Sequence, residues 1–271
     1  MSENVPRAEI TLKPALYRMP GMDAVRIKPD VVYQSGATGD LVMDLYYPSR
    51  FTAEASLPAV ILVVGYSDVA AEAKVGCKLK EMESLKSWSR LIAASGVVAI
   101  TYTNREPEPD FHALLQHVRQ NAPALGIDAA RIGLWATSGN SPLVLSTLIA
   151  GGREHLKCAA LLYPFLLDLD GTAVVAEASR TYKFVNPCAG KLLEDLPLDV
   201  PLLLVRAGRE EFPHLNETID RFAAQALLRN LPLTLVNHAA APHAFDLFQD
   251  SHATRATIRL VLEFFCSSLA P

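Results

Sequence analysis

Short apolar runs alternate with amphipathic segments along most of this chain, and this alternation limits the folds that are open to it. Strands that are buried on both faces have such continuous apolar composition, because helices cover both sides of a parallel sheet. Runs of this kind occur at residues 58–65, 97–102, 132–136, 158–164, 201–208 and 232–237. Helical segments separate or follow them at residues 79–95, 110–125, 142–150, 215–229 and 253–267. The pattern predicts an α/β fold with a mostly parallel sheet flanked by helices.

The two ends of this pattern suggest how the chain is organised. Residues 1–30 are polar and proline-rich, so we expect an N-terminal arm, followed by one domain over residues 31–271. Residues 31–33 and 41–48 read as two strands of an antiparallel edge hairpin. The segment of about 165–200 follows the sixth predicted strand, lacks the alternation, and is too long for a simple connection. We therefore predict a cap insertion there, over a site.

The amino-acid composition limits the classes of function that this protein can have. The 271 residues are 50% hydrophobic and 20% charged, with a net charge of −4, as in ordinary globular proteins. The basic residues are scattered, which argues against binding to nucleic acid or to anionic membranes. The first residues lack the apolar core of a secretion signal, and no apolar run reaches membrane-span length. We expect a cytoplasmic protein, for which a homodimer is one compatible assembly.

Metal and disulfide sites are not expected. The four cysteines lie far apart, with no C-x-x-C pair and no histidine at ligand spacing. The run Asp-Leu-Asp-Gly at 168–171 begins like a calcium loop, but no glutamate follows at the spacing of a bidentate ligand.

A serine stands where a buried strand turns into a helix. Residues 132–136 form the apolar run, Ser138 follows, and the helical segment 142–150 ends before two glycines. Such a turn lifts the serine hydroxyl above the sheet edge, and the helix N-terminus behind it offers backbone N–H groups to an oxyanion. The turn is crowded and favours small residues two positions before and after the serine, which here are Ala136 and Asn140.

Further polar residues follow other strands. Ligands of α/β sheets bind at the carboxyl ends of the strands, so these residues are candidates for one site. Gly65 and Tyr66 follow the first buried strand, and two adjacent acids, Glu210 and Glu211, follow the strand at 201–208. The last strand leads to His238 at its end and to His243 in the next loop.

The runs Gly-Leu-Trp-Ala-Thr-Ser-Gly-Asn at 133–140 and His-Ala-Phe-Asp-Leu at 243–247 resemble the α/β-hydrolase superfamily. The likeness is greatest to dienelactone-hydrolase-like and bacterial carboxylesterase-like members. The superfamily's elbow is G-x-S-x-G, whereas this chain has A-x-S-x-N, and its triad runs in the order Ser, acid, His, as here. The resemblance implies Ser138 as nucleophile, His243 of an H-x-F pattern as base, and Glu211, three residues after Gly208, as acid. Glu210 and His238 stay as alternates for the last two roles.

The resemblance also implies an oxyanion hole formed by the backbone N–H groups of Tyr66 and Gly139. The superfamily often has histidine before the glycine of the first loop, and this chain has Val64.

The implied activity is that of a serine esterase that cleaves small to medium carboxylic esters without a metal or cofactor. Dienelactone hydrolases carry cysteine at the elbow, so Ser138 favours esters over lactones. A lactonase, thioesterase or peptidase with the same triad is an alternative, as is a non-hydrolytic binding or scaffold protein. Cap residues are expected to wall an apolar substrate pocket, namely Phe165, Leu166, Tyr182 and Phe184.

Overall fold

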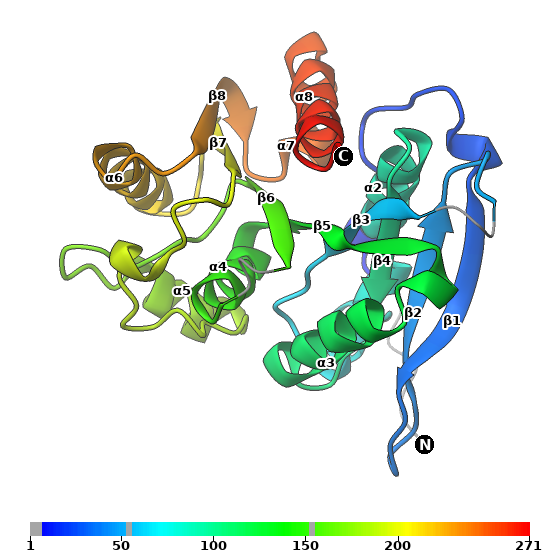
Figure 1. Ribbon diagram of the computed structural model, residues 1–271. Helices are drawn as coiled ribbons and strands as arrows, with labels where there is room; N and C mark the ends of the chain where they lie inside the picture. The colour runs from blue at the N-terminus through cyan, green and yellow to red at the C-terminus, as the bar shows by residue number, and fades with distance from the viewer. Residues whose placement is uncertain (1–6, 53–55, 152–154) are drawn as a thin grey trace.

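A single eight-stranded sheet organises the molecule. The computed structural model describes residues 7–52, 56–151 and 155–271. The strand order is β1-β2-β4-β3-β5-β6-β7-β8, and Figure 1 shows the sheet twisting from β1 at one edge to β8 at the other. The strands are β1 (Arg26–Gln34), β2 (Leu41–Tyr47), β3 (Leu57–Leu62), β4 (Val98–Tyr102), β5 (Ile127–Thr137), β6 (Leu156–Leu162), β7 (Leu202–Arg209) and β8 (Leu233–Pro242).

Pairing within the sheet is antiparallel on one side only. β2 runs antiparallel to both β1 and β4, whereas the strands from β4 through to β8 pair in parallel. The central strands carry side chains that are buried on both faces, as the continuous apolar runs required. The predicted α/β class with a mostly parallel sheet is therefore confirmed.

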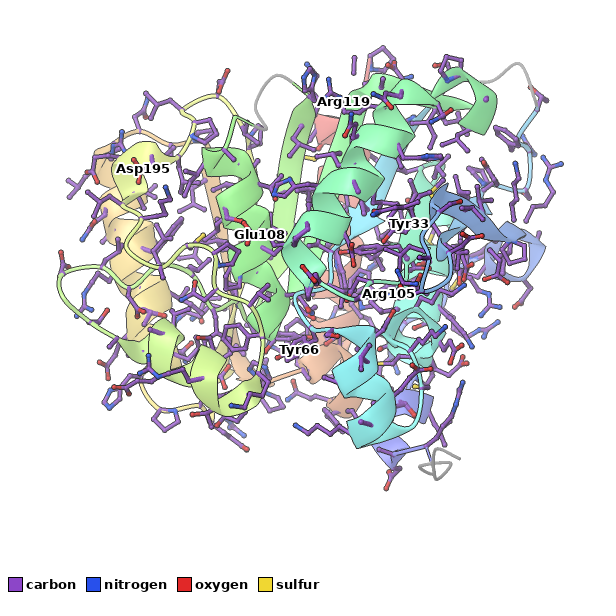
Figure 2. All side chains as sticks on the ribbon, turned by 90° about the horizontal axis from the view of Figure 1, so that it is seen from below. Tyr33, Tyr66, Arg105, Glu108, Arg119 and Asp195 are labelled. Atoms are coloured by element: carbon purple, nitrogen blue, oxygen red, sulfur yellow. The ribbon has the colours of Figure 1, made fainter. Side chains whose placement is uncertain are left out.

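Helices cover both faces of the sheet. In Figures 1 and 2, α2 and α8 lie on one face, and α3 and α4 lie on the other. The helices are α1 (Asp68–Val75), α2 (Glu83–Ala94), α3 (Pro107–Gln120), α4 (Ser141–Ile149), α5 (Val174–Tyr182), α6 (Leu215–Leu228), α7 (Phe245–Phe248) and α8 (His252–Ser268). In the part of the chain that the structure describes, no helix combines the length and apolar character that a bilayer crossing needs.

Helix α1 lies in a stretch where the sequence pattern marks no helix. Only Asp68 and Ala71 of this helix are buried, so it carries little of the apolar periodicity that marks a helix. The Asp68 carboxylate holds the segment instead, because it accepts hydrogen bonds from the backbone N–H of Leu79 (2.7 Å) and of Asn104 (2.9 Å). Burial raises the pKa of Asp68.

Residues 7–25 precede β1, which begins at Arg26. Their backbone N–H groups bond to three separate elements: Ala8 donates to the Val75 carbonyl, Ala15 to Ser87 Oγ and Leu16 to the Asp246 carbonyl. The segment between β6 and β7 contains α5 and the 3₁₀ turn Leu193–Asp195. We retain as a proposal that the N-terminal segment is an arm and that the segment between β6 and β7 is a cap.

Candidate active site

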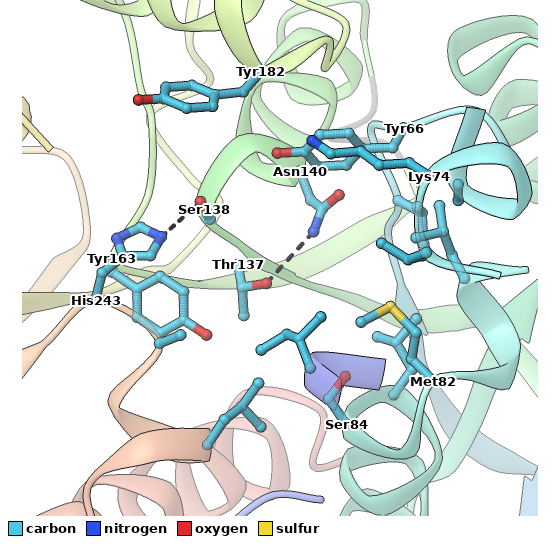
Figure 3. Close-up of a pocket in the computed structure, with 18 of the residues that line it drawn as sticks. Tyr66, Lys74, Met82, Ser84, Thr137, Ser138, Asn140, Tyr163, Tyr182 and His243 are labelled. Carbon is cyan, nitrogen blue, oxygen red and sulfur yellow. Dashed lines mark hydrogen bonds between the residues drawn. The ribbon is translucent and has the colours of Figure 1, made fainter. Parts of the chain in front are cut away.

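Ser138 lies at the sharp turn between β5 and α4. Its φ angle is 51°, in the left-handed region that residues other than glycine rarely adopt. This backbone conformation ends the strand at Thr137, and α4 then begins three residues later at Ser141. The Ser138 hydroxyl lies 2.8 Å from Nε2 of His243, as the dashed line in Figure 3 marks. The predicted strand-to-helix turn is thus present, and it presents the hydroxyl to a histidine.

Asn140, in place of the usual glycine, ties this turn to the loop after β3. Its φ and ψ angles are −81° and −18°, so the position does not require glycine. The Asn140 side-chain oxygen accepts a hydrogen bond of 2.8 Å from the Gly65 N–H. Gly65 itself must lack a side chain, because a Cβ there would lie 2.8 Å from the carbonyl oxygen of Gly139. The departure from the G-x-S-x-G pattern therefore adds a contact between two loops of the site.

His243 follows β8 directly and precedes α7. Its Nδ1 lies 2.7 Å from Oε2 of Glu210, on the side of the ring opposite Ser138. The rings of Tyr163 and Phe212 each lie with their centroids 4.6 Å from that of the imidazole. The imidazole is thus held by a carboxylate and two aromatic rings, and its side chain stays 17% exposed.

The structure places Glu210, the alternate of the expected acid, against the imidazole, and it does not bring Glu211 there. Strand β7 extends to Arg209, one residue beyond the predicted end, and Arg209 pairs with Pro242 of β8. Glu210 and His243 are the next residues of the two strands, so they meet. Glu211 points into solvent, as alternate side chains of an extended chain do.

The Glu210 carboxylate is fixed on both oxygens. Its side chain is 1% exposed, and Oε1 accepts hydrogen bonds from the backbone N–H groups of Glu211 (2.9 Å) and Phe212 (3.0 Å). These two donors leave Oε2 directed at His243.

His238 lies outside the site. It is 6% exposed, and its Nε2 lies 3.2 Å from the Thr254 hydroxyl on α8. Burial lowers the pKa of His238, and its ring packs against that of Phe245.

Tyr66 and Gly139 are brought together above the sheet edge. A Cβ on Gly139 would lie 2.5 Å from the Tyr66 hydroxyl and from a ring carbon of Phe184. The Tyr66 carbonyl accepts a hydrogen bond of 3.0 Å from the Asn104 side chain, which holds the loop after β3. Burial raises the pKa of Tyr66 to about 12.

A cavity of about 480 Å³ opens beside Ser138, and most of its wall is apolar. Its wall comes from the N-terminal segment, α1, the start of α2, α7 and the ends of β5 and β6. Among the four cap residues expected to form the wall, Tyr182 lines the cavity (Figure 3). Phe165, Leu166 and Phe184 are instead buried, and the rings of Phe165 and Phe184 pack 5.1 Å apart.

The sequence pattern does not single out two polar residues of the cavity wall, Asp246 and Tyr163. The Asp246 carboxylate is buried and accepts hydrogen bonds from Trp88 Nε1 (2.8 Å) and from the Tyr163 hydroxyl (2.7 Å). Burial raises the pKa of Asp246. Tyr163 follows β6, so a search of every strand end would have found it; Asp246 lies in the short helix α7, which the sequence pattern does not signal.

Solved structures with a similar fold were found by comparison with known proteins. No protein-family model and no curated protein sequence matches the chain. Among solved structures, a bacterial heroin esterase matches at 14% identity and TM-score 0.66, over 94% of this chain and 88% of its own. The thermophilic esterase Est2 of the planctomycete Thermogutta terrifontis matches at 21% identity and TM-score 0.67, over 97% and 99% of the two chains. Thermogutta terrifontis esterase 2 phosphorylated by paraoxon matches at 20% identity and TM-score 0.63, over 94% and 97%.

These likenesses, together with the sheet topology, show that the chain has the α/β-hydrolase fold, as the resemblance implied. The finer resemblance to dienelactone hydrolases stays a prediction.

Proposed function

We propose that this protein is a serine hydrolase that cleaves small to medium carboxylic esters through Ser138, His243 and Glu210. The observation that carries the proposal is the continuous set of contacts from the Ser138 hydroxyl through His243 to a buried carboxylate. Each of the three residues comes from a different loop at the carboxyl end of the sheet. The esterase names of the structural neighbours support the same reaction.

The first half of the reaction forms an acyl-enzyme. Ser138 Oγ attacks the ester carbonyl carbon while Nε2 of His243 takes the hydroxyl proton. The resulting imidazolium donates through Nδ1 to Glu210, which stabilises its charge and fixes the tautomer. The tetrahedral intermediate then collapses, and the alcohol leaves with the proton from His243.

The second half releases the acid. Water attacks the acyl-enzyme carbonyl, His243 accepts a proton from that water, and the second tetrahedral intermediate expels Ser138 Oγ, which regains its proton. None of these steps calls on a group beyond the ester, water and the residues of this chain.

The backbone N–H groups of Tyr66 and Gly139 would receive the oxyanion in both halves. Within residues 7–52, 56–151 and 155–271, neither N–H donates a hydrogen bond to another part of the protein. Both therefore stay available to a carbonyl oxygen that gains negative charge.

Hydrolysis of 4-nitrophenyl butyrate by purified variants tests the proposal. We expect Ser138→Ala to lower kcat by several orders of magnitude, because the nucleophile is lost. Ser141→Ala is the matched control: this serine lies in the same turn, is buried, and its hydroxyl has no partner among the described residues. It should stay within a few-fold of the wild type. Equal activity of wild type and Ser138→Ala would leave a binding or scaffold role as the better account.

A further inference from the structure

The exposed charged residues that line the cavity beside Ser138 are positive, although the chain as a whole is acidic. Lys74 of α1 and Lys183, the residue that caps α5, both line it and both are exposed. Among the described residues, neither lysine forms an ion pair with a carboxylate. The net charge of the whole chain is −4, so this local excess of positive charge is not a property of the surface in general.

The carboxylate of the lining does not neutralise these lysines. Asp246 is the only acidic residue of the cavity wall in the part of the chain described, and it is 1% exposed. Both of its oxygens already accept hydrogen bonds, from Trp88 and Tyr163. The cavity wall is therefore mostly apolar and bears two exposed ammonium groups.

The direction of the Lys74 side chain also bears on its role. Lys74 lies in the last turn of α1 and Lys183 caps α5, where the helix dipole favours cations. That effect accounts for a lysine on these turns, but it does not require the side chain to face the cavity. Figure 3 shows the Lys74 side chain reaching from α1 over the cavity, on the side where Tyr66 and Asn140 lie.

We propose that the preferred substrates are esters that carry an anionic group beyond an apolar chain or ring, and that Lys74, assisted by Lys183, selects that group. The ester carbonyl lies at Ser138, the apolar part fills the cavity, and the anion remains at the solvated mouth. Exposed ammonium groups attract such an anion without the cost of burying a charge, and their field raises the local concentration of anionic substrates. This inference rests on the proposed ester hydrolysis.

Two matched substrate pairs test this preference, one with the anion on the acyl part of the ester and one with the anion on the alcohol part. Mono-4-nitrophenyl suberate is compared with its methyl ester, and 4-acetoxybenzoate with methyl 4-acetoxybenzoate. The quantity measured is the ratio of kcat/KM for the anionic ester to that for the neutral ester. The proteins are the wild type, Lys74→Gln, Lys183→Gln, the double variant, and Lys78→Gln, a control in which a nearby lysine outside the lining loses its charge.

In at least one pair, we expect Lys74→Gln to lower the ratio about fivefold, which is the upper range for an exposed ion pair. The double variant should lower it further, and Lys78→Gln should leave it unchanged. Raising the ionic strength to about 0.5 M should lower the wild-type ratio toward that of the double variant, because salt screens exposed charges.

An unchanged ratio in Lys74→Gln and in the double variant, for both pairs, overturns the inference. If these variants change the melting temperature but not the kcat/KM ratio, the inference is also overturned. The lysines would then stabilise the helix ends and not select the substrate. The proposed function itself is tested by the neutral member of each pair. The wild type should cleave its aryl ester bond, and Ser138→Ala should not. Should Ser138→Ala retain that hydrolysis, the proposed function is wrong and the substrate preference falls with it.

Discussion

Two backbone features set the directions of the Ser138 and Glu210 side chains. The left-handed φ of 51° at Ser138 costs about 1–2 kcal/mol relative to ordinary backbone, and it is retained where the nucleophile would act. Strand β7 ends at Arg209, which turns Glu210 inward and Glu211 outward. At this scale the structure assigns one partner to each nitrogen of His243.

The two adjacent glutamates should respond very differently to the loss of charge. We expect Glu210→Gln to lower kcat by about two to four orders of magnitude, because the amide leaves the imidazolium uncompensated and the tautomer unset. Glu211→Gln should stay within a few-fold of the wild type, since Glu211 bonds to the Glu210 carboxylate through its backbone N–H, which the substitution retains. Steady-state kinetics on both variants measure this, and the reverse pattern would show that Glu211 is the acid.

From the sequence, Glu211 is expected as the acid and Glu210 as its alternate, whereas Glu210 is the glutamate that lies against His243. Ser138 and His243 stand out because each follows a run that must be a buried strand. The choice between Glu210 and Glu211 depends on how β7 and β8 align. That alignment includes an irregularity between Ala207 and Arg209, which no local pattern reveals.

At the scale of elements, the turn after β5 and the loop after β3 act as one unit. The Asn140 side chain accepts from the Gly65 N–H, and the Val185 N–H donates to the Gly65 carbonyl. Gly65 is thereby held from two sides, next to the backbone N–H of Tyr66.

Removing the Asn140 side chain should loosen this unit. We expect Asn140→Ala to lower kcat about tenfold, because a small displacement of an oxyanion donor weakens stabilisation of the transition state. The free energy of unfolding should fall by about 1 kcal/mol for the lost hydrogen bond. Kinetics and urea unfolding measure the two effects, and Asn121→Ala, an exposed change at the end of α3, serves as control. Wild-type kcat in Asn140→Ala would contradict a role for this bridge.

Elements with strong local patterns are predicted well, and short elements are not. All eight strands overlap runs that the sequence marks, and α2, α3, α4, α6 and α8 overlap its helical segments. Helices α1 and α7 lack a marked apolar period, because α1 buries two residues and α7 is four residues long. The parts of the cavity wall that α1 and α7 supply are not predicted for the same reason.

At the scale of the whole molecule, one sheet gathers residues that are far apart in the chain. Tyr66, Ser138, Glu210 and His243 follow β3, β5, β7 and β8, whose carboxyl ends lie at one edge. The helices on both faces keep that edge fixed, so the site depends on the stability of the entire fold. His238 joins β8 to α8 within this framework.

The stability of the fold should therefore depend on pH through His238. Burial lowers its pKa in the folded protein, so the unfolded chain binds a proton more readily. Stability should be constant above the ordinary histidine pKa of about 6.5 and fall as the pH drops below it. Urea unfolding of the wild type and of His238→Gln across this range measures the effect. The variant should lose less stability on acidification, and parallel curves for the two proteins would exclude His238 as a source.

The most direct test of the account is covalent labelling of the nucleophile. We expect a fluorophosphonate probe to add a single phosphonyl group to the native protein, and peptide mass mapping to place it on Ser138. Ser138→Ala should take up no label, while Glu211→Gln should be labelled like the wild type. The absence of an adduct on the folded wild-type protein, or an adduct on a residue other than Ser138, would contradict the proposed reaction.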